Sequence, residues 1–360
     1  MAQPIDFSQF NFSAEEIRSI RELVFDAVLE SPDLNIIHTF YPGIVYDRQI
    51  GFIGEGSIVG KRAQGCNPEP QEFNIATRAL TWSPKRWGVE LQICYTDLEQ
   101  TMVVYSLKQG VEISDLTGTD YMAIVVDLLT KAIKKMIWRF LWFGDTDAEN
   151  YIPAEGETPA SGGIITPGID VEYLDLIDGF WKQLKALSAG NSQLVPVSAN
   201  TAATTAAQFA NMTGQMAYDT LNKLHLSAPV ILRNQANLNF YCTQSFADAY
   251  MTYLEGKELD ATYENLVEGV RALKFRGYNL IPIQIWDEMI ATFENLGAKL
   301  NNPHRVVFTT KDILAVGIPS TGILDTVDLW YEKTTKQNHL RAEDGLDAKV
   351  LRNDFFMLGI

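Results

Sequence analysis

Residues 119–143 read TDYMAIVVDLLTKAIKKMIWRFLWF, and this stretch decides the fold. Its apolar residues fall on more than one helical stripe, one through Val125 and Leu128 and another through Val126 and Leu129. A helix with so wide an apolar face is buried on several sides. At 1.5 Å per residue, roughly 25 residues would span about 37 Å, the length of a domain. A membrane span is excluded, because charges interrupt the run at Asp127, Lys131, Lys134, Lys135 and Arg139.

The segments on either side of this helix define the order of elements in this part of the chain. A strand is expected at Leu91-Gln92-Ile93-Cys94-Tyr95, followed by the capping box Thr96-x-x-Glu99, which would start a helix from Asp97 to about Gln109. After the long helix comes the turn Gly144-Asp145, and then the glycine-rich segment Gly162-Gly163-Ile164-Ile165-Thr166-Pro167-Gly168. The order is therefore strand, short helix, long helix and glycine-rich connection.

The amino-terminal third combines one helix with one hairpin. Ser13 and Glu16 form a capping box for an amphipathic helix from Ser13 to about Leu29. Glycines are dense between residues 51 and 65, and this segment lies between candidate strands at Val45–Ile53 and Phe73–Leu80. The pattern predicts a long hairpin whose tip spans roughly residues 54–70.

The remainder is predicted to be mixed helix and strand. Helices are expected at Val171–Leu187, Ala203–Lys223 and Gln244–Leu254. Strands are expected at Pro229–Leu232, Tyr278–Ile285, Arg305–Thr309, Ala315–Gly317 and Thr326–Tyr331. The tail, residues 341–356, ends in a strand-like apolar run. A final strand that rejoins an earlier sheet would make the first and last thirds one structural unit.

Composition narrows the function classes. The chain has 360 residues with 45 acidic and 29 basic side chains, a formal net charge of −16. Such a surface repels a nucleic-acid backbone, so direct DNA or RNA binding is not expected. The three cysteines, Cys66, Cys94 and Cys242, are far apart and support neither a disulfide framework nor a zinc site. Residues 1–6 lack the basic and apolar regions of a signal peptide, so folding in a reducing cytoplasm is expected.

Two segments match a known binding motif only in part, and each lacks residues that the motif requires. The segment from Gly54 to Lys61 resembles a phosphate loop, but Glu55 occupies its first glycine position and Arg62 follows the lysine. Residues 145–156 begin with the spacing of a calcium loop, but Asn150 and Gly156 stand where glycine and glutamate are required. A flexible loop and a solvated helix-exit turn are the preferred interpretations, although Glu155 could still help to bind a weak cation.

No active site is indicated. The four histidines show no HExxH spacing, and no GxSxG motif is present. Carboxylate pairs such as Asp175 with Asp178 have the spacing of solvated faces, and no base or metal ligand accompanies them. We therefore expect no catalytic residue, no cofactor and no metal.

Aromatic and basic residues gather just after the predicted hairpin. Trp82 and Trp87 flank Lys85 and Arg86, and this composition is typical of an interface anchor. The alternative is that both rings pack inward on their own domain. The two interpretations are equally supported by the residues.

The order of elements resembles that of the Hong Kong phage capsid family, the major capsid proteins of tailed phages. The resemblance implies an α+β fold with an amino-terminal arm (1–48), an extended β-hairpin loop (49–90), a peripheral domain (91–170) with spine helix 119–143, and an axial α/β domain (171–335). Residues 336–360 would form strands that return to the peripheral domain. Because the loop of one such subunit lies over its neighbour, the implied inter-subunit contact candidates are Glu55, Lys61, Arg62, Trp82, Lys85, Arg86 and Trp87.

The resemblance also implies a function. The chain would be the major capsid protein of a tailed double-stranded DNA bacteriophage, made in the host bacterial cytoplasm and assembled with itself as pentamers and hexamers into an icosahedral virion shell. The shell would enclose DNA without specific binding and without a membrane; scaffold, portal or decoration proteins are further partners that the family allows. Two alternatives remain: an encapsulin-like nanocompartment that packages protein cargo, and a cytoplasmic α/β enzyme with a dispersed active site.

Overall fold

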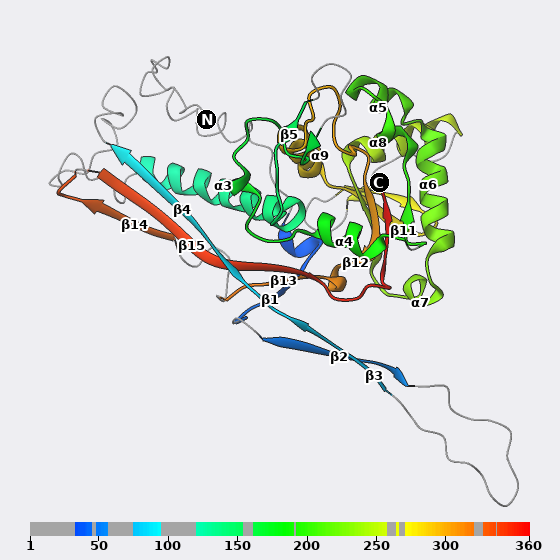
Figure 1. The fold of residues 1–360 in the computed structure, drawn as a ribbon, viewed down its shortest axis with the longest axis horizontal. Helices are drawn as coiled ribbons and strands as arrows, with labels where there is room; N and C mark the ends of the chain where they lie inside the picture. Colours follow the sequence, from blue (N-terminus) through cyan, green and yellow to red (C-terminus); the bar gives the residue numbers. More distant parts are fainter. Residues whose placement is uncertain are drawn as a thin grey trace, which may run out of the picture.

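The computed structural model of the chain describes residues 33–44, 48–56, 75–94, 120–153, 161–190, 192–257, 264–265, 271–319, 327–335 and 337–360. Three expectations lie outside these residues: the helix at Ser13–Leu29, the capping box with its helix at Asp97–Gln109, and most of the hairpin tip. Glu155 also lies outside them. The described part contains two sheets, a projecting hairpin and a long helix (Figure 1).

The long helix is confirmed as α3 (Asp120–Phe143). Its last seven residues are buried except for Arg139, and Ile133, Ile137 and Leu141 lie in the core. The helix ends at Phe143, and at the next residue, Gly144, a Cβ atom would lie 2.4 Å from the backbone oxygens of both Phe140 and Ile177. Only glycine fits there, so the Gly144-Asp145 turn allows the chain to leave the helix while packed against the segment after it.

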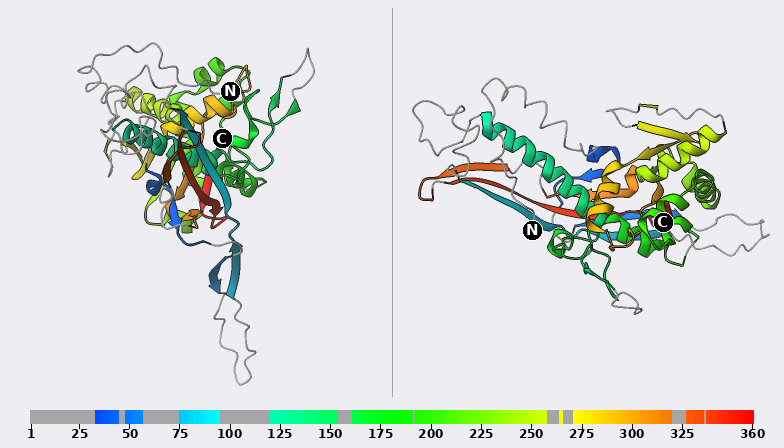
Figure 2. Two further views of the ribbon diagram at one scale, coloured as in Figure 1. Left: turned by 90° about the vertical axis from the view of Figure 1, so that its left-hand side faces the viewer. Right: turned by 90° about the horizontal axis from the view of Figure 1, so that it is seen from above.

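A five-stranded sheet unites segments from the start, the first third and the end of the chain. Its order is β1-β13-β15-β14, and β4 also pairs with β15. The strands are β1 (Thr39–Tyr41), β4 (Lys85–Cys94), β13 (Leu314–Gly317), β14 (Val327–Glu332) and β15 (Gln337–Val350). The expectation that a late strand rejoins an early one is confirmed, because β15 pairs antiparallel with β4 from Gln337↔Cys94 to Leu346↔Lys85. α3 runs along this sheet (Figure 2).

A seven-stranded sheet forms the second centre, in the order β7-β16-β12-β8-β11-β10-β9. Its strands are β7 (Leu194–Val195), β8 (Leu238–Cys242), β9 (Glu264–Asn265), β10 (Arg271–Phe275), β11 (Tyr278–Pro282), β12 (Val306–Thr310) and β16 (Phe356–Gly359). The inner strand β12, Val-Val-Phe-Thr-Thr, is buried at every position, as a strand covered on both faces requires. The helices around the sheet are α4 (Phe180–Ser188), α5 (Thr205–Asn211), α6 (Gly214–Ser227), α7 (Val230–Arg233), α8 (Gln244–Gly256) and α9 (Gln284–Phe293).

The two sheets revise the expected boundaries. β13 and β14, expected in the axial part, lie in the five-stranded sheet beside β15. β16, expected to return to the peripheral part with the rest of the tail, instead pairs with β12 and β7 of the seven-stranded sheet. The physical reason is the short link between β15 and β16, which carries the chain directly from one sheet into the other.

Three expected elements differ in detail. Pro229–Leu232 is not a strand: it is helical, because the Arg233 N–H donates to the Pro229 carbonyl at 3.1 Å and the Asn234 N–H donates to the Val230 carbonyl. The helix expected at Ala203–Lys223 is two helices, α5 and α6, each with its own threonine cap, Thr204 and Thr213. The helix expected at Val171–Leu187 reduces to a 3-10 turn, η3 (Val171–Tyr173), followed by α4.

Short connections complete the described fold. Three further 3-10 turns are η1 (Leu34–Ile36), η4 (Ser198–Thr201) and η6 (Lys311–Ile313), and a two-residue ribbon joins β5 (Tyr151–Ile152) to β6 (Ser161–Gly162). Among the described helices, none is both long and apolar enough to cross a membrane.

Aromatic rings join α3, α4 and α9 in the core. The ring centroid of Trp142 lies 4.4 Å from that of Trp286 and 4.9 Å from that of Trp181. The Trp142 Nε1–H donates to Nε2 of His38 at 2.9 Å, and Nδ1 of His38 lies 2.8 Å from the Leu34 carbonyl oxygen. Because a carbonyl only accepts, Nδ1 carries the proton and the ring is neutral. Burial lowers the pKa of His38 to about 4.

We expect the free energy of unfolding to decrease as the pH falls from about 6.5 to about 4. Over that range the unfolded chain binds a proton at His38 while the folded chain does not, which removes about 3 kcal/mol. In His38→Gln, which keeps one donor and one acceptor, this component should be absent. Denaturant unfolding of both proteins across the pH range tests the expectation, and identical pH profiles would contradict it. A smaller slope should persist in the variant, because burial also lowers the pKa of His304 to about 4.

Candidate assembly surfaces

The hairpin is the first candidate surface, because it extends away from the body (Figures 1 and 2). Its strands β2 (Gln49–Gly56) and β3 (Ile75–Thr81) pair antiparallel from Gln49↔Thr81 to Gly56↔Ile75, with an irregularity after Ile53. A two-stranded ribbon alone is marginally stable in water, so it gains stability by packing on another surface. Of the tip residues expected to contact a neighbour, Glu55 lies on β2, whereas Lys61 and Arg62 lie outside the described residues.

Trp82 fixes the base of the hairpin and does not face outward. Its ring is buried beside Tyr41, at a centroid distance of 6.0 Å, and a Cβ atom at Gly317 would lie 2.7 Å from it. Its backbone N–H donates to the Arg48 carbonyl, and the next residue, Ser83, donates its N–H to Asp347 of β15 at 2.7 Å. The inward-packing interpretation is therefore the observed one.

Trp87 is buried as well, within the main core cluster. Lys85 and Arg86, between the two rings, are exposed on β4 and pair through their backbones with Leu346 and Gly345. The four residues thus divide by chemistry: the tryptophans hold the hairpin and β4 to their own subunit, and the two basic side chains face outward. A contact of Lys85 and Arg86 with a neighbouring copy stays a prediction.

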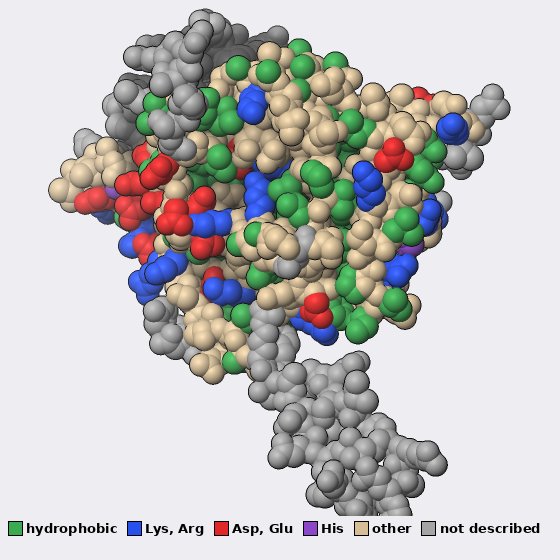
Figure 3. All heavy atoms as spheres, turned by 45° about the vertical axis from the view of Figure 1, so that its right-hand side comes forward, with side chains coloured by type: hydrophobic (Ala, Val, Ile, Leu, Met, Phe, Trp, Pro, Cys, Tyr) green, Lys and Arg blue, Asp and Glu red, His purple; other side chains and the backbone are tan. Residues whose placement is uncertain are grey.

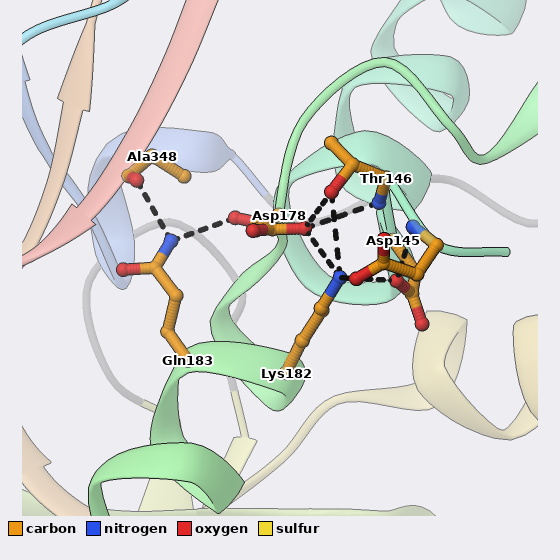
Figure 4. Close-up of polar contacts among 7 residues, drawn as sticks. Asp145, Thr146, Asp178, Lys182, Gln183 and Ala348 are labelled. Atoms are coloured by element: carbon orange, nitrogen blue, oxygen red, sulfur yellow. Dashed lines mark hydrogen bonds and ion pairs between the residues drawn. The ribbon is translucent and has the colours of Figure 1, made fainter.

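The acidic turn after α3 is occupied by a lysine of the same chain (Figure 4). The ammonium of Lys182, on α4, lies 2.5 Å from Asp145, 2.7 Å from Asp147 and 2.8 Å from Asp178. Partial burial disfavours its charge, but hydrogen bonds to the three carboxylates raise the pKa of Lys182 above its usual range. This turn therefore has its cation built in, which supports the rejection of a calcium loop. No cluster suited to a metal ion occurs in the described part of the chain.

A pocket of about 490 Å³ opens between α5 and α8, and it contains an arrangement that the sequence did not reveal. The Ser245 hydroxyl lies 3.0 Å from Nδ1 of His304, whose Nε2 lies 3.2 Å from the Gln208 carbonyl oxygen. Because that carbonyl only accepts, Nε2 carries the proton and Nδ1 can accept from the hydroxyl. The three residues are dispersed over the sequence, so no spacing rule could have found them.

The geometry of this pair differs from that of a hydrolase. The nearby carboxylate of Asp287 accepts from the backbone N–H groups of Gln244 and Ser245 at 2.7 and 3.3 Å, so it caps α8 and leaves His304 without a carboxylate partner. Burial lowers the pKa of His304 to about 4, which makes the imidazole a weak base. We interpret the pair as part of the network that holds α5, α8 and β12 together.

Comparison with known proteins identifies the fold. No protein-family model matches the sequence, and no curated protein does. Among solved structures, the capsid of an empty GTA particle covers 92% of this chain and 97% of its own, with 12% identity and a TM-score of 0.50. A structure from Gordonia phage Cozz covers 99% of this chain and 91% of its own at 10% identity (TM-score 0.49), and the SrpI encapsulin complex of Synechococcus elongatus covers 97% and 95% at 10% identity (TM-score 0.49).

Replacing Trp82 by alanine should lower the free energy of unfolding by about 3–5 kcal/mol, because a large buried ring is lost and the base of the hairpin loosens. Trp330→Ala is the matched control: this ring is 41% exposed on β14, and its loss should cost about 1 kcal/mol or less. Denaturant unfolding measures both. Equal losses would contradict the anchoring role of Trp82.

Replacing Lys182 by methionine should destabilise the subunit by about 1–2 kcal/mol, because three carboxylates lose their common cation. The loss should shrink in 1 M salt, where ions screen the remaining repulsion. Lys131→Met serves as the control, since Lys131 forms an i,i+4 ion pair with the exposed Asp127 at 3.5 Å. A salt-independent loss would show that the acidic turn is not held by charge.

The similarity to the GTA capsid extends over 92% of this chain and 97% of the other. The chain therefore has the Hong Kong phage capsid-like fold.

Proposed function

We propose that this chain is a shell-forming structural subunit, the major capsid protein of a tailed double-stranded DNA bacteriophage. The observation that carries the proposal is the fold shared with a GTA capsid over 92% of this chain and 97% of the other. Copies would assemble as pentamers and hexamers into an icosahedral virion shell. The subunit would act through its geometry and not through an active site.

The hairpin supports this proposal. A two-stranded ribbon that extends from the body has no core of its own and is only marginally stable in water. It becomes stable when it lies on a neighbouring copy. Repetition of the same contact around a closed shell multiplies its effect. Each interface can then be modest, near the standard of about 800 Å² per partner.

Charge supports the same proposal. A net charge of −16 makes the subunit repel the backbone of the genome that it encloses, so a packaged duplex would not adhere to the wall. An encapsulin-like shell with protein cargo would have the same fold, and the contents of the particle distinguish the two. The ratio of absorbance at 260 and 280 nm of purified particles measures whether they hold nucleic acid or protein.

The first test is the oligomeric state of the purified protein by size-exclusion chromatography with light scattering, followed by negative-stain imaging of the leading peak. Rings of five or six subunits, or closed shells, are the expected result. A monomer of 40.3 kDa at every protein and salt concentration would contradict the proposal. In that case the enzyme alternative, with the Ser245–His304 pair, would be the next hypothesis to test.

Replacing residues 57–74 by a short Gly-Ser turn that rejoins β2 to β3 should leave a folded subunit that no longer closes into shells. Circular dichroism and thermal unfolding should match the parent, because the described core is unchanged. A second variant with a Gly-Ser segment of the original length separates the reach of the loop from its side-chain contacts. Normal shells from both variants would refute the role assigned to the hairpin.

A further inference from the structure

Three large aliphatic side chains are exposed together where α6 ends and α7 begins. Leu226 is 59% exposed, Val230 62% and Ile231 51%. We call these three residues the α7 knob. Exposed apolar residues that stand alone are ordinary, but three of them within six residues of the chain indicate a contact surface. Within residues 226–232, only Ala228 and Leu232 are buried.

Basic side chains border the α7 knob. Arg276 lies in the tight turn between β10 and β11, with φ of 51° and Gly277 after it at 85°, and its Nη1 is 3.3 Å from Nδ1 of His225. Partial burial, followed by the charges of Arg276 and Arg233, lowers the pKa of His225, so this ring is neutral at pH 7. Neither arginine forms an ion pair with a carboxylate of the described residues. On the face shown in Figure 3, hydrophobic side chains lie among Lys and Arg toward the lower right.

The pocket between α5 and α8 is also partly apolar, but its charged residues are acidic, whereas those that border the knob are basic. Its apolar wall is formed by Phe209, which is 46% exposed, with Met212 and Ala249. Its acidic wall is formed by Asp248 and Asp287. These two carboxylates hydrogen-bond to the amide of Gln244 and to backbone N–H groups, and no described lysine or arginine forms an ion pair with either. The pocket thus matches the knob in both polarity and charge.

One subunit cannot bring the two surfaces together. The pocket lies at the start of α6 and the α7 knob at its end, and 14 helical residues separate them by about 21 Å. Figure 1 shows α5 and α8 on the upper side of this part of the fold and α7 at its lower corner. Two different, complementary surfaces on opposite sides of one body are what a heterologous, ring-closing contact requires.

We propose that the α7 knob of one copy inserts into the α5–α8 pocket of the next copy, with Arg233 and Arg276 facing Asp248 and Asp287. The contact repeats head to tail and closes rings of this chain. It rests on the proposed function, since it specifies which surfaces of the shell subunit meet within a ring.

The first experiment is a directed disulfide in the full chain. Ile231→Cys and Phe209→Cys are combined with Cys66→Ser and Cys94→Ser, and the buried Cys242 is kept. Oxidation of the assembled protein should produce a ladder of covalent oligomers on a denaturing gel that ends at the ring size. The matched control replaces Phe209→Cys by Trp330→Cys, an exposed position on β14 of the five-stranded sheet, and should give no ladder beyond dimers.

The second experiment reverses charge. Arg276→Glu and Asp248→Lys should each lower the fraction assembled at a fixed protein concentration by about tenfold, because like charges then face each other. The double variant should recover most of the assembly, since the pair is restored with opposite sign. Thermal unfolding of each variant checks that the subunit is folded, as expected for exposed positions.

The outcomes separate this proposal from the function on which it rests. A ladder together with charge rescue supports the contact. Rings or shells that form without the Ile231–Phe209 crosslink overturn the contact and leave the structural function intact; the pocket or the knob would then serve a different partner. A wild-type protein that never assembles overturns both.

Discussion

The fold depends on the pairing of β15 with three strands: the distant β4, and β13 and β14, which precede it in the chain. Its first ten residues pair with β4, the first six of these lie between β4 and β14, and its last four residues pair with β13. Because β13 also holds β1, one strand near the carboxyl terminus orders the start, the first third and the end of the chain. The base of the hairpin is fixed through the same strand, where Asp347 accepts the Ser83 N–H. Contacts of such large sequence separation form late and cooperatively, so the projecting hairpin is positioned only in the complete subunit.

A polar and an aromatic connection join the helices α3 and α4 to the seven-stranded sheet. Arg305, fully buried at the start of β12, forms an ion pair with Glu294 and donates to the Asn301 and Asn302 carbonyls. Its guanidinium lies 5.4 Å from the ring of Phe143 at the end of α3 and 5.3 Å from that of Trp181 on α4. These contacts offset much of the cost of burying the charge, although Nη1 of Arg305 has no hydrogen-bond partner among the described residues. The end of the spine helix and the start of helix α4 are therefore packed directly against the beginning of β12.

The features predicted correctly from the sequence are those that depend on hydrophobic periodicity and on the order of elements along the chain. α3 was placed within one residue, and the hairpin and the return of the tail to an early strand were expected from pattern alone. The failures have physical causes. Pro229–Leu232 has the composition of a buried strand but lies at an exposed corner, where local N–H···O bonds make it helical. Trp82 and Trp87 were equally compatible with inward and outward packing, because composition does not encode which neighbours surround a ring. The Lys182 cluster and the Ser245–His304 pair join residues from separate elements, so no local spacing records them.

Apolar burial and electrostatics, which stabilise the core, also explain the arrangement of the exposed surfaces. A subunit in a closed shell must be soluble before assembly and adhesive within it, and these demands conflict for any single large apolar face. Division of the adhesive surface into small and different parts resolves the conflict: a hairpin without its own core, an apolar knob with a basic border and a pocket with an acidic wall. Each part is too small to cause aggregation alone, and complementary charge directs the knob to the pocket and away from a second knob. Assembly then depends on several modest contacts acting together, which favours the closed, regular arrangement over any one misplaced contact.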